Sequence, residues 1–113
     1  MRFLVAESDE RSAELLCQML RDLGHGVCGI ARTARQAVGL IQIAQPRALL
    51  VALDLAGALE LARTAYRRSG IRTLFAGHAD AALVRNLHAI QPYGFIAKPL
   101  LPGGSAEGTG QAV

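Results

Sequence analysis

The chain of 113 residues contains no tryptophan, and aromatic residues make up only 4% of it. Its two cysteines, Cys17 and Cys28, are too few for a disulfide framework and stand among apolar residues without metal-binding spacing. We therefore expect two reduced, buried thiols and not a disulfide or a metal pair. Lysine is almost absent, since eleven arginines accompany the single Lys98. A lone lysine indicates a position that needs the compact point charge of an ammonium group instead of the planar guanidinium of arginine.

Long apolar runs are also absent, and none approaches the length of a membrane-spanning helix. The acidic Glu7, Asp9 and Glu10 follow the first apolar segment too closely for a signal peptide, so we expect a cytoplasmic, globular protein without membrane contact. The net charge of +3 comes from arginines spread along the chain, and no tract interleaves aromatic with basic residues. Nucleic-acid binding is therefore not expected. A chain of this length forms one domain.

Apolar and β-branched runs alternate with helical periodicity from one end to the other, which predicts repeated β-α units around a mainly parallel sheet. Helices are expected at about 9–23, 33–45, 58–68 and 80–90. Leu23 lies on the apolar face expected for the first helix, and Thr33 can cap the second, whose expected buried stripe includes Val38. Right-handed crossovers between the strands then give a three-layer, doubly wound α/β fold. The five expected strands are Arg2 to Ala6, Gly26 to Ala31, Ala48 to Leu53, Arg72 to Ala76 and Tyr93 to Ala97.

The end of the chain has a different character. After Lys98-Pro99 the sequence Leu100-Leu101 is followed by a Gly-rich stretch without an apolar period. Such a composition predicts a disordered tail over 101–113, following a folded domain over 1–100.

Two segments carry a resemblance to a known family. Residues 46–57, Pro-Arg-Ala-Leu-Leu-Val-Ala-Leu-Asp-Leu-Ala-Gly, read as a strand buried on both faces that runs into a loop. Residues 94–100, Gly-Phe-Ile-Ala-Lys-Pro-Leu, place the lone lysine at the end of the last strand. Together they resemble the CheY-like receiver domains of bacterial response regulators over residues 1 to about 100. The resemblance implies a flavodoxin-like sheet of order 2-1-3-4-5. These domains normally have a fifth helix, and we expect it to be absent here.

The resemblance also implies a site at the carboxyl ends of the strands, where open α/β sheets bind their ligands. Ala52, six residues after Pro46, stands where the family has its phosphate-accepting aspartate. An alanine cannot act as a nucleophile. The alternative acceptor is Asp54, because lengthening the strand by two residues keeps the side chain on the same face.

The positions that would hold a metal depart from the family pattern as well. Glu7 matches the first of two adjacent acidic residues that bind Mg²⁺, but Ser8 occupies the second place, and a hydroxyl is a poorer Mg²⁺ ligand than a carboxylate. Asp9 either reaches into this site or caps the following helix, and the capping role is favoured. Mg²⁺ binding should therefore be weak, and no other cofactor is implied.

The switch positions depart from the family pattern in the same way. A threonine hydroxyl is expected after the fourth strand, but Ala76 or Gly77 stands there, depending on the direction in which the residues are counted. By the same resemblance, Lys98 matches the lysine that pairs with the phosphoryl group, and Phe95 matches the switch aromatic residue. His78 is interpreted as a solvent-facing loop histidine.

These observations favour a pseudo-receiver, which is a non-enzymatic domain of a two-component phosphorelay that is not phosphorylated and acts by protein-protein contact. The implied partner is a histidine kinase or another regulator. Absence of the fifth helix predicts an exposed apolar sheet face, which a second copy in a homo-oligomer such as a dimer, or a partner protein, would cover.

Two alternatives remain beside the pseudo-receiver. The first is an active receiver that is phosphorylated on Asp54 with Mg²⁺. The second is a small nucleotide-binding flavodoxin-like enzyme, which is disfavoured because no Gly-rich phosphate loop follows the first strand.

Overall fold

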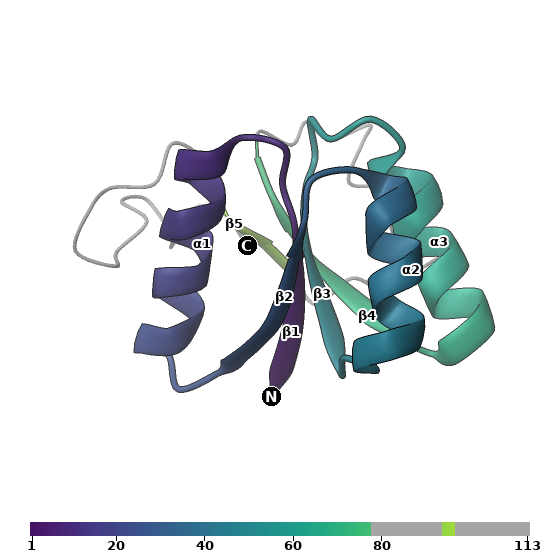
Figure 1. The fold of residues 1–113 in the computed structure, drawn as a ribbon, viewed down its shortest axis with the longest axis horizontal. Coiled ribbons are helices and arrows are strands. Elements are labelled where there is room, and N and C mark those ends of the chain that lie inside the picture. The colour runs from purple at the N-terminus through teal and green to yellow at the C-terminus, as the bar shows by residue number, and fades with distance from the viewer. Residues whose placement is uncertain (78–93, 97–113) are drawn as a thin grey trace.

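The computed structural model describes residues 1–77 and 94–96. These residues form a parallel five-stranded sheet of order β2-β1-β3-β4-β5, with α1 on one face and α2 and α3 on the other (Figure 1). The predicted doubly wound α/β fold and its strand order are confirmed. The elements are β1 (Arg2–Ala6), α1 (Glu10–Asp22), β2 (Gly26–Ala31), α2 (Ala34–Ala44), β3 (Ala48–Ala52), α3 (Ala58–Ser69), β4 (Arg72–Ala76) and β5 (Gly94–Ile96).

The strand limits follow the predicted ones closely. β1, β2 and β4 have the expected bounds, whereas β3 ends one residue earlier, at Ala52. β5 is described over Gly94–Ile96, and the two expected end residues, 93 and 97, lie outside the described part of the chain. The predicted helix at 80–90, the absence of a fifth helix and the disordered tail lie outside the described residues. Among the described helices, none has the length and hydropathy needed to cross a membrane.

Capping residues fix where the helices begin and end. The Asp9 carboxylate accepts a hydrogen bond from the Ser12 backbone N–H at 2.8 Å, and the Thr33 hydroxyl accepts one from the Gln36 N–H at 3.0 Å. At the other end of α2, the Arg2 guanidinium donates to the carbonyl of Ala44 at 2.7 Å. Each contact satisfies a backbone group that the helix itself leaves unpaired. The contact of Arg2 also ties the end of α2 to the start of β1.

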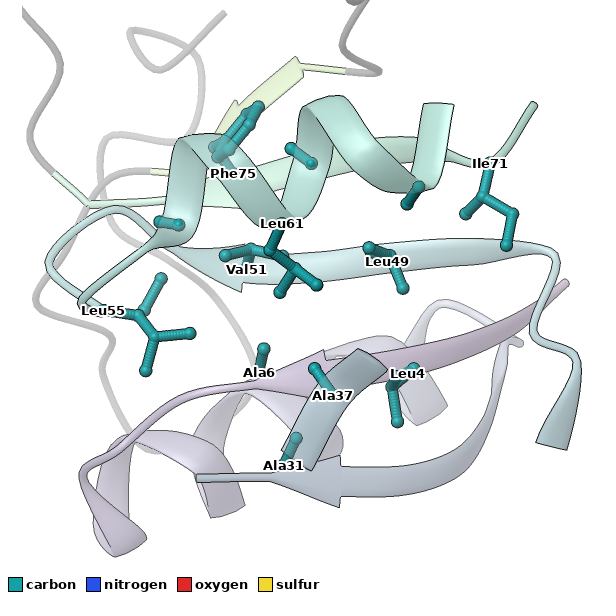
Figure 2. Packing of buried hydrophobic residues seen from close by; sticks show 14 residues of the cluster. Leu4, Ala6, Ala31, Ala37, Leu49, Val51, Leu55, Leu61, Ile71 and Phe75 are labelled. Carbon is teal, nitrogen blue, oxygen red and sulfur yellow. The ribbon is translucent and has the colours of Figure 1, made fainter. Parts of the chain in front are cut away.

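The core consists of two layers, because successive side chains of a strand point to opposite faces of the sheet. On the side of α2 and α3, Leu61 points from α3 toward Val51 and Leu49 of β3 (Figure 2). On the side of α1, Leu16 and Leu20 lie in one cluster with Leu50. β3 contributes buried residues to both layers and is buried along its whole length. An unbroken apolar run is thus explained by burial on both faces.

Burial is uneven on the α1 side of the described strands. Leu50 and Ala76 are fully buried and Ile96 is 6% exposed, whereas Ile30 of β2, which pairs with Val5, is 40% exposed. Exposure of this face through the absence of a fifth helix stays a prediction, because residues 97–113 lie outside the described part of the chain.

The helix faces differ from prediction at their margins. Leu23 was expected to point inward but is 66% exposed, because it is the C-cap residue of α1 and the chain turns away at Gly24, whose φ is +87°. α2 packs through the small Ala37, its one fully buried residue. The larger Val38, expected in the core, is 38% exposed. A helix that packs through alanine leaves its larger apolar residues at the edge of the contact.

The two thiols are unpaired, as expected, but only Cys17 is buried. The Cys28 thiol is partly exposed and donates to the carbonyl of Phe3 at 3.4 Å. Burial raises the pKa of the Cys17 thiol, and the nearby Arg21 guanidinium opposes this effect only in part. The thiolate is the reactive form, so Cys17 should react slowly at neutral pH.

We expect iodoacetamide to alkylate Cys28 before Cys17 in the folded protein. Raising the pH should accelerate alkylation of Cys17, because its raised pKa leaves little thiolate at pH 7. Peptide mapping by mass spectrometry over a time course measures both rates. Equal rates in the folded chain, or faster modification of Cys17, would contradict this prediction.

β4 contains a buried polar group, the side chain of Thr73, which is 1% exposed. Within the described part of the chain its hydroxyl has no hydrogen-bond partner. An unsatisfied buried hydroxyl is destabilising, whereas a methyl group of similar size is not.

We predict that Thr73→Val raises the free energy of unfolding by about 1 kcal/mol, because valine keeps the β-branched shape and removes the unpaired hydroxyl. Urea denaturation followed by circular dichroism measures the change. Thr64→Val, at a half-buried position of α3, serves as the control and should have a smaller effect. A loss of stability in Thr73→Val would show that the hydroxyl is satisfied in solution.

Candidate functional site

The register of the sheet brings the predicted site residues to one edge. Ala6 pairs with Val51, Ala52 with Ala76, and Ala76 with Ile96. The pairing continues past the strand ends, because the Leu53 N–H donates to the carbonyl of Ala76 at 2.8 Å. The Gly77 N–H likewise donates to the carbonyl of Ile96 at 2.8 Å. The loops that follow β1, β3 and β4 therefore leave the sheet from neighbouring points, at its carboxyl edge.

The acceptor position holds a buried methyl group. Ala52 is the last residue of β3, is 0% exposed and lies opposite the equally buried Ala76. The chain then turns, since the Leu55 N–H donates back to the carbonyl of Ala52 at 3.1 Å. A covalent phosphoryl acceptor requires a nucleophilic side chain, and a methyl group provides none.

Asp54 is exposed in the turn between β3 and α3, two residues beyond the end of the strand. The alternative assignment of the acceptor assumes that the strand continues to residue 54. The strand ends at Ala52 instead, so the alternation of a strand does not orient the Asp54 side chain. Its position is set by the turn.

Glu7 is the buried carboxylate of this edge, at 1% exposure. Its backbone N–H donates to the carbonyl of Ala31 at 2.9 Å, which anchors the residue beside β2. One carboxylate oxygen accepts a hydrogen bond from the Ser8 N–H at 3.1 Å. Hydrogen bonds to a buried carboxylate offset part of the cost of removing it from water.

The two residues that follow Glu7 lie at the surface. Ser8 and Asp9 are exposed, and the Asp9 carboxylate caps α1, as the sequence favoured. Over residues 1–77 and 94–96, no three histidine, cysteine or acidic side chains gather in a way that could hold a metal ion. Mg²⁺ prefers several oxygen ligands in octahedral geometry. Glu7 and Asp9 therefore do not form part of a metal-binding group of three such residues within these ranges.

Ala76 and Gly77 are the two candidates for the switch position. At one of them, Gly77, the backbone explains why the residue is small. Gly77 has a φ of +148°, in a region that residues with a side chain rarely adopt. A Cβ atom on Gly77 would also lie 3.0 Å from the Cβ of Leu53. A threonine at residue 77 is therefore disfavoured by both conformation and contact. Ala76, the other candidate, is fully buried at the end of β4.

The remaining predicted residues are placed only in part. Phe95 pairs with Phe75 across β4 and β5. Lys98 and His78 lie outside the described residues. Their roles therefore stay predictions that follow from the resemblance.

One contact at this edge of the sheet was not predicted from the sequence. Arg32, in the loop before α2, forms an ion pair with Glu10 at the start of α1 at 3.7 Å. Both side chains are exposed, so the pair contributes little to stability. It joins the start of α1 to the loop that follows β2. No pattern of spacing could have predicted it, because the two residues are far apart in the sequence.

Comparison with known proteins gives a consistent result at the level of the fold. No protein-family model and no curated protein sequence matches the chain. Among solved structures, the signal receiver domain of a modulated diguanylate cyclase from Desulfovibrio desulfuricans is 23% identical. It superposes with a TM-score of 0.76 over 98% of this chain and 91% of its own. The chain has the fold of a response-regulator receiver domain.

Other receiver domains agree with this assignment of the fold. A CheY-like receiver domain protein from Methanospirillum hungatei is 24% identical, with a TM-score of 0.74 over 89% of this chain and 83% of that one. The response regulator domain of Thermotoga maritima CheB is 17% identical, with a TM-score of 0.77 over 98% and 86% of the two chains. The chain thus spans most of the length of these domains. Its receiver fold is established by geometry, while its site must be judged from its own residues.

Restoring the receiver aspartate tests how closely residue 52 is packed. We predict that Ala52→Asp lowers the free energy of unfolding at pH 7 by roughly 2 kcal/mol, because it buries a carboxylate in place of a methyl group. Burial should raise the pKa of the new aspartate above its unfolded value. The penalty is therefore small below the unfolded pKa and grows as the pH rises toward the folded one.

Denaturant titrations at pH 4 and pH 7 measure this change. Ala56→Asp, on an exposed residue of the turn that follows β3, is the matched control and should alter stability by less than about 0.5 kcal/mol at either pH. An Ala52→Asp protein as stable as the control would show that residue 52 faces an open, solvated site.

Proposed function

We propose that this chain is a signalling domain of the two-component type that acts through protein-protein contact and is not itself phosphorylated. The observation that carries the proposal is Ala52, a fully buried alanine at the end of β3 in a receiver fold. The fold supports the signalling role, and the residue supports the loss of phosphorylation.

Chemistry at the carboxyl edge supports the same conclusion. Aspartyl phosphorylation needs a carboxylate nucleophile, a metal ion to offset the charge on the phosphoryl oxygens, and donors for those oxygens. Ala52 lacks the nucleophile, and Ser8 replaces the second metal-binding carboxylate. Neither Ala76 nor Gly77 carries a hydroxyl. All three departures fall on one reaction, while the sheet that positions these residues is intact.

The partner would be a histidine kinase or another regulatory protein, since contact is the activity left to a receiver fold without phosphorylation. Self-association into a homo-oligomer stays a prediction of the sequence. On the α1 side of the described strands, Leu50 and Ala76 are fully buried and Ile30 is 40% exposed.

A second candidate function is an active receiver that uses Asp54 with Mg²⁺. The observation that favours it is the exposure of Asp54 in the turn beside the carboxyl edge, where a phosphodonor can reach it. This carboxylate would have to act from a turn instead of from the end of a strand. The proposed function and this alternative predict opposite results in one experiment.

We expect that incubation of the full chain with Mg²⁺ and acetyl phosphate gives no phosphorylated species by intact-mass spectrometry. The control is an active receiver domain treated in parallel, which must become phosphorylated under the same conditions. A phosphorylated product that disappears in Asp54→Asn would overturn the proposal and assign the acceptor to Asp54. The conservative change to asparagine keeps the size of the side chain and removes only its nucleophilic carboxylate.

A further inference from the structure

A hollow of about 60 Å³ lies on the outer surface between α2 and α3. Val38 and Ile41 line it from α2, and Leu61 and Ala65 line it from α3. Arg68, in the last turn of α3, completes the lining together with a few small polar residues. This hollow lies away from the carboxyl edge of the sheet and takes no part in the candidate site.

Small residues at the first turns of the two helices bring them close together at one end. A Cβ atom on Gly57, the N-cap residue of α3, would lie 3.3 Å from the Cβ of Ala34 in α2. Farther along, α2 buries only Ala37 completely, and Val38 keeps 38% of its surface exposed. The exposed part of the apolar lining therefore comes mainly from Val38 and the half-buried Ile41 of α2, because Leu61 and Ala65 are only 3% and 4% exposed. Apolar surface gathered in a concavity is typical of a binding site.

The charge around the hollow has one sign. α2 contains no acidic residue, and the one acidic side chain of α3, Glu60, is ion-paired with Arg63 at 2.8 Å. Arg67 and Arg68 are exposed in the last turn of α3. On the opposite face of the sheet, α1 exposes both signs of charge, with three acidic residues and two arginines: Glu10, Glu14, Asp22, Arg11 and Arg21. Positive charge beside an apolar surface is thus a property of the α2 and α3 side.

We propose that this hollow binds an amphipathic helix of a partner protein, with an apolar side chain that enters the hollow and acidic residues that pair with Arg68 at its rim and with the neighbouring Arg67. A concave surface is filled by a convex one, and a helix lying in a groove is a recurrent solution. Two copies of the same hollow cannot fill each other, which disfavours a symmetric dimer through this face. The inference goes beyond the proposed function, because it depends only on the hollow and its arginines.

The test uses a synthetic helical peptide of about 18 residues, long enough for five turns, with leucines on one face and glutamates on the other. A lysine version and a scrambled glutamate version serve as comparison peptides. Isothermal titration calorimetry should show binding of the glutamate helix to the full chain at least about tenfold tighter than either comparison peptide. Added salt should weaken it, and NMR shift changes should map to α2 and α3.

Two substitutions and two matched controls locate the site. Val38→Glu introduces an acidic group into the hollow, and Arg68→Glu reverses the charge of its rim, so each should weaken binding at least about tenfold. Ile43→Glu changes an isoleucine of the same helix that is 81% exposed and does not line the hollow. Arg21→Glu changes the corresponding last-turn arginine of α1. Both controls should bind like the unchanged protein.

Absence of binding by the glutamate helix would overturn the inference, as would equal binding of the scrambled or lysine peptide. Self-association that depends on concentration and is abolished by Val38→Glu would assign the hollow to a second copy instead. Binding to anionic lipid vesicles, lost in Arg68→Glu, without peptide binding would assign it to a membrane surface. Phosphorylation of Asp54 would overturn the proposed function and leave this result unaffected.

Discussion

Burial of β3 on both faces is the constraint on which the rest of the structure depends. The strand pairs with β1 on one side and β4 on the other, and its side chains enter the core layers of α1 and of α2 and α3. A polar residue within it would need a buried partner, which explains its unbroken apolar sequence. Since β3 also fixes where the chain reaches the carboxyl edge, the packing of the core determines what stands at the acceptor position.

Features set by local chemistry could be predicted from the sequence. The apolar runs predicted the strands, and the resemblance to receiver domains implied their order. The caps at Asp9 and Thr33 were recognisable because capping needs only a side-chain oxygen and the next turn of the helix. Features set by how closely two elements approach could not be predicted. Packing of α2 through Ala37 left Val38 exposed, and the C-cap position of Leu23 took it out of the core.

The candidate site also combines features that could be predicted from the sequence with features that could not. The positions of Glu7, Ala52 and Ala76 at one edge follow from strand parity and parallel register, which a sequence can indicate. The left-handed backbone at Gly77 and its contact with Leu53 depend on the path of the β3 loop, and no spacing of residues reveals it. The strand predicted to end at Leu53 already left Asp54 outside it, but the turn that begins one residue earlier, directly after Ala52, was not evident from the sequence.

The conformation of Gly77 limits which residues the chain can accept directly after β4. A side chain with a hydroxyl cannot be introduced at residue 77 without strain, because it would meet Leu53 and an unfavourable φ together. Such a change would need Leu53 to shift as well. The residues that follow β3 and β4 are therefore constrained as a pair, and a substitution at one of these positions is felt at the other.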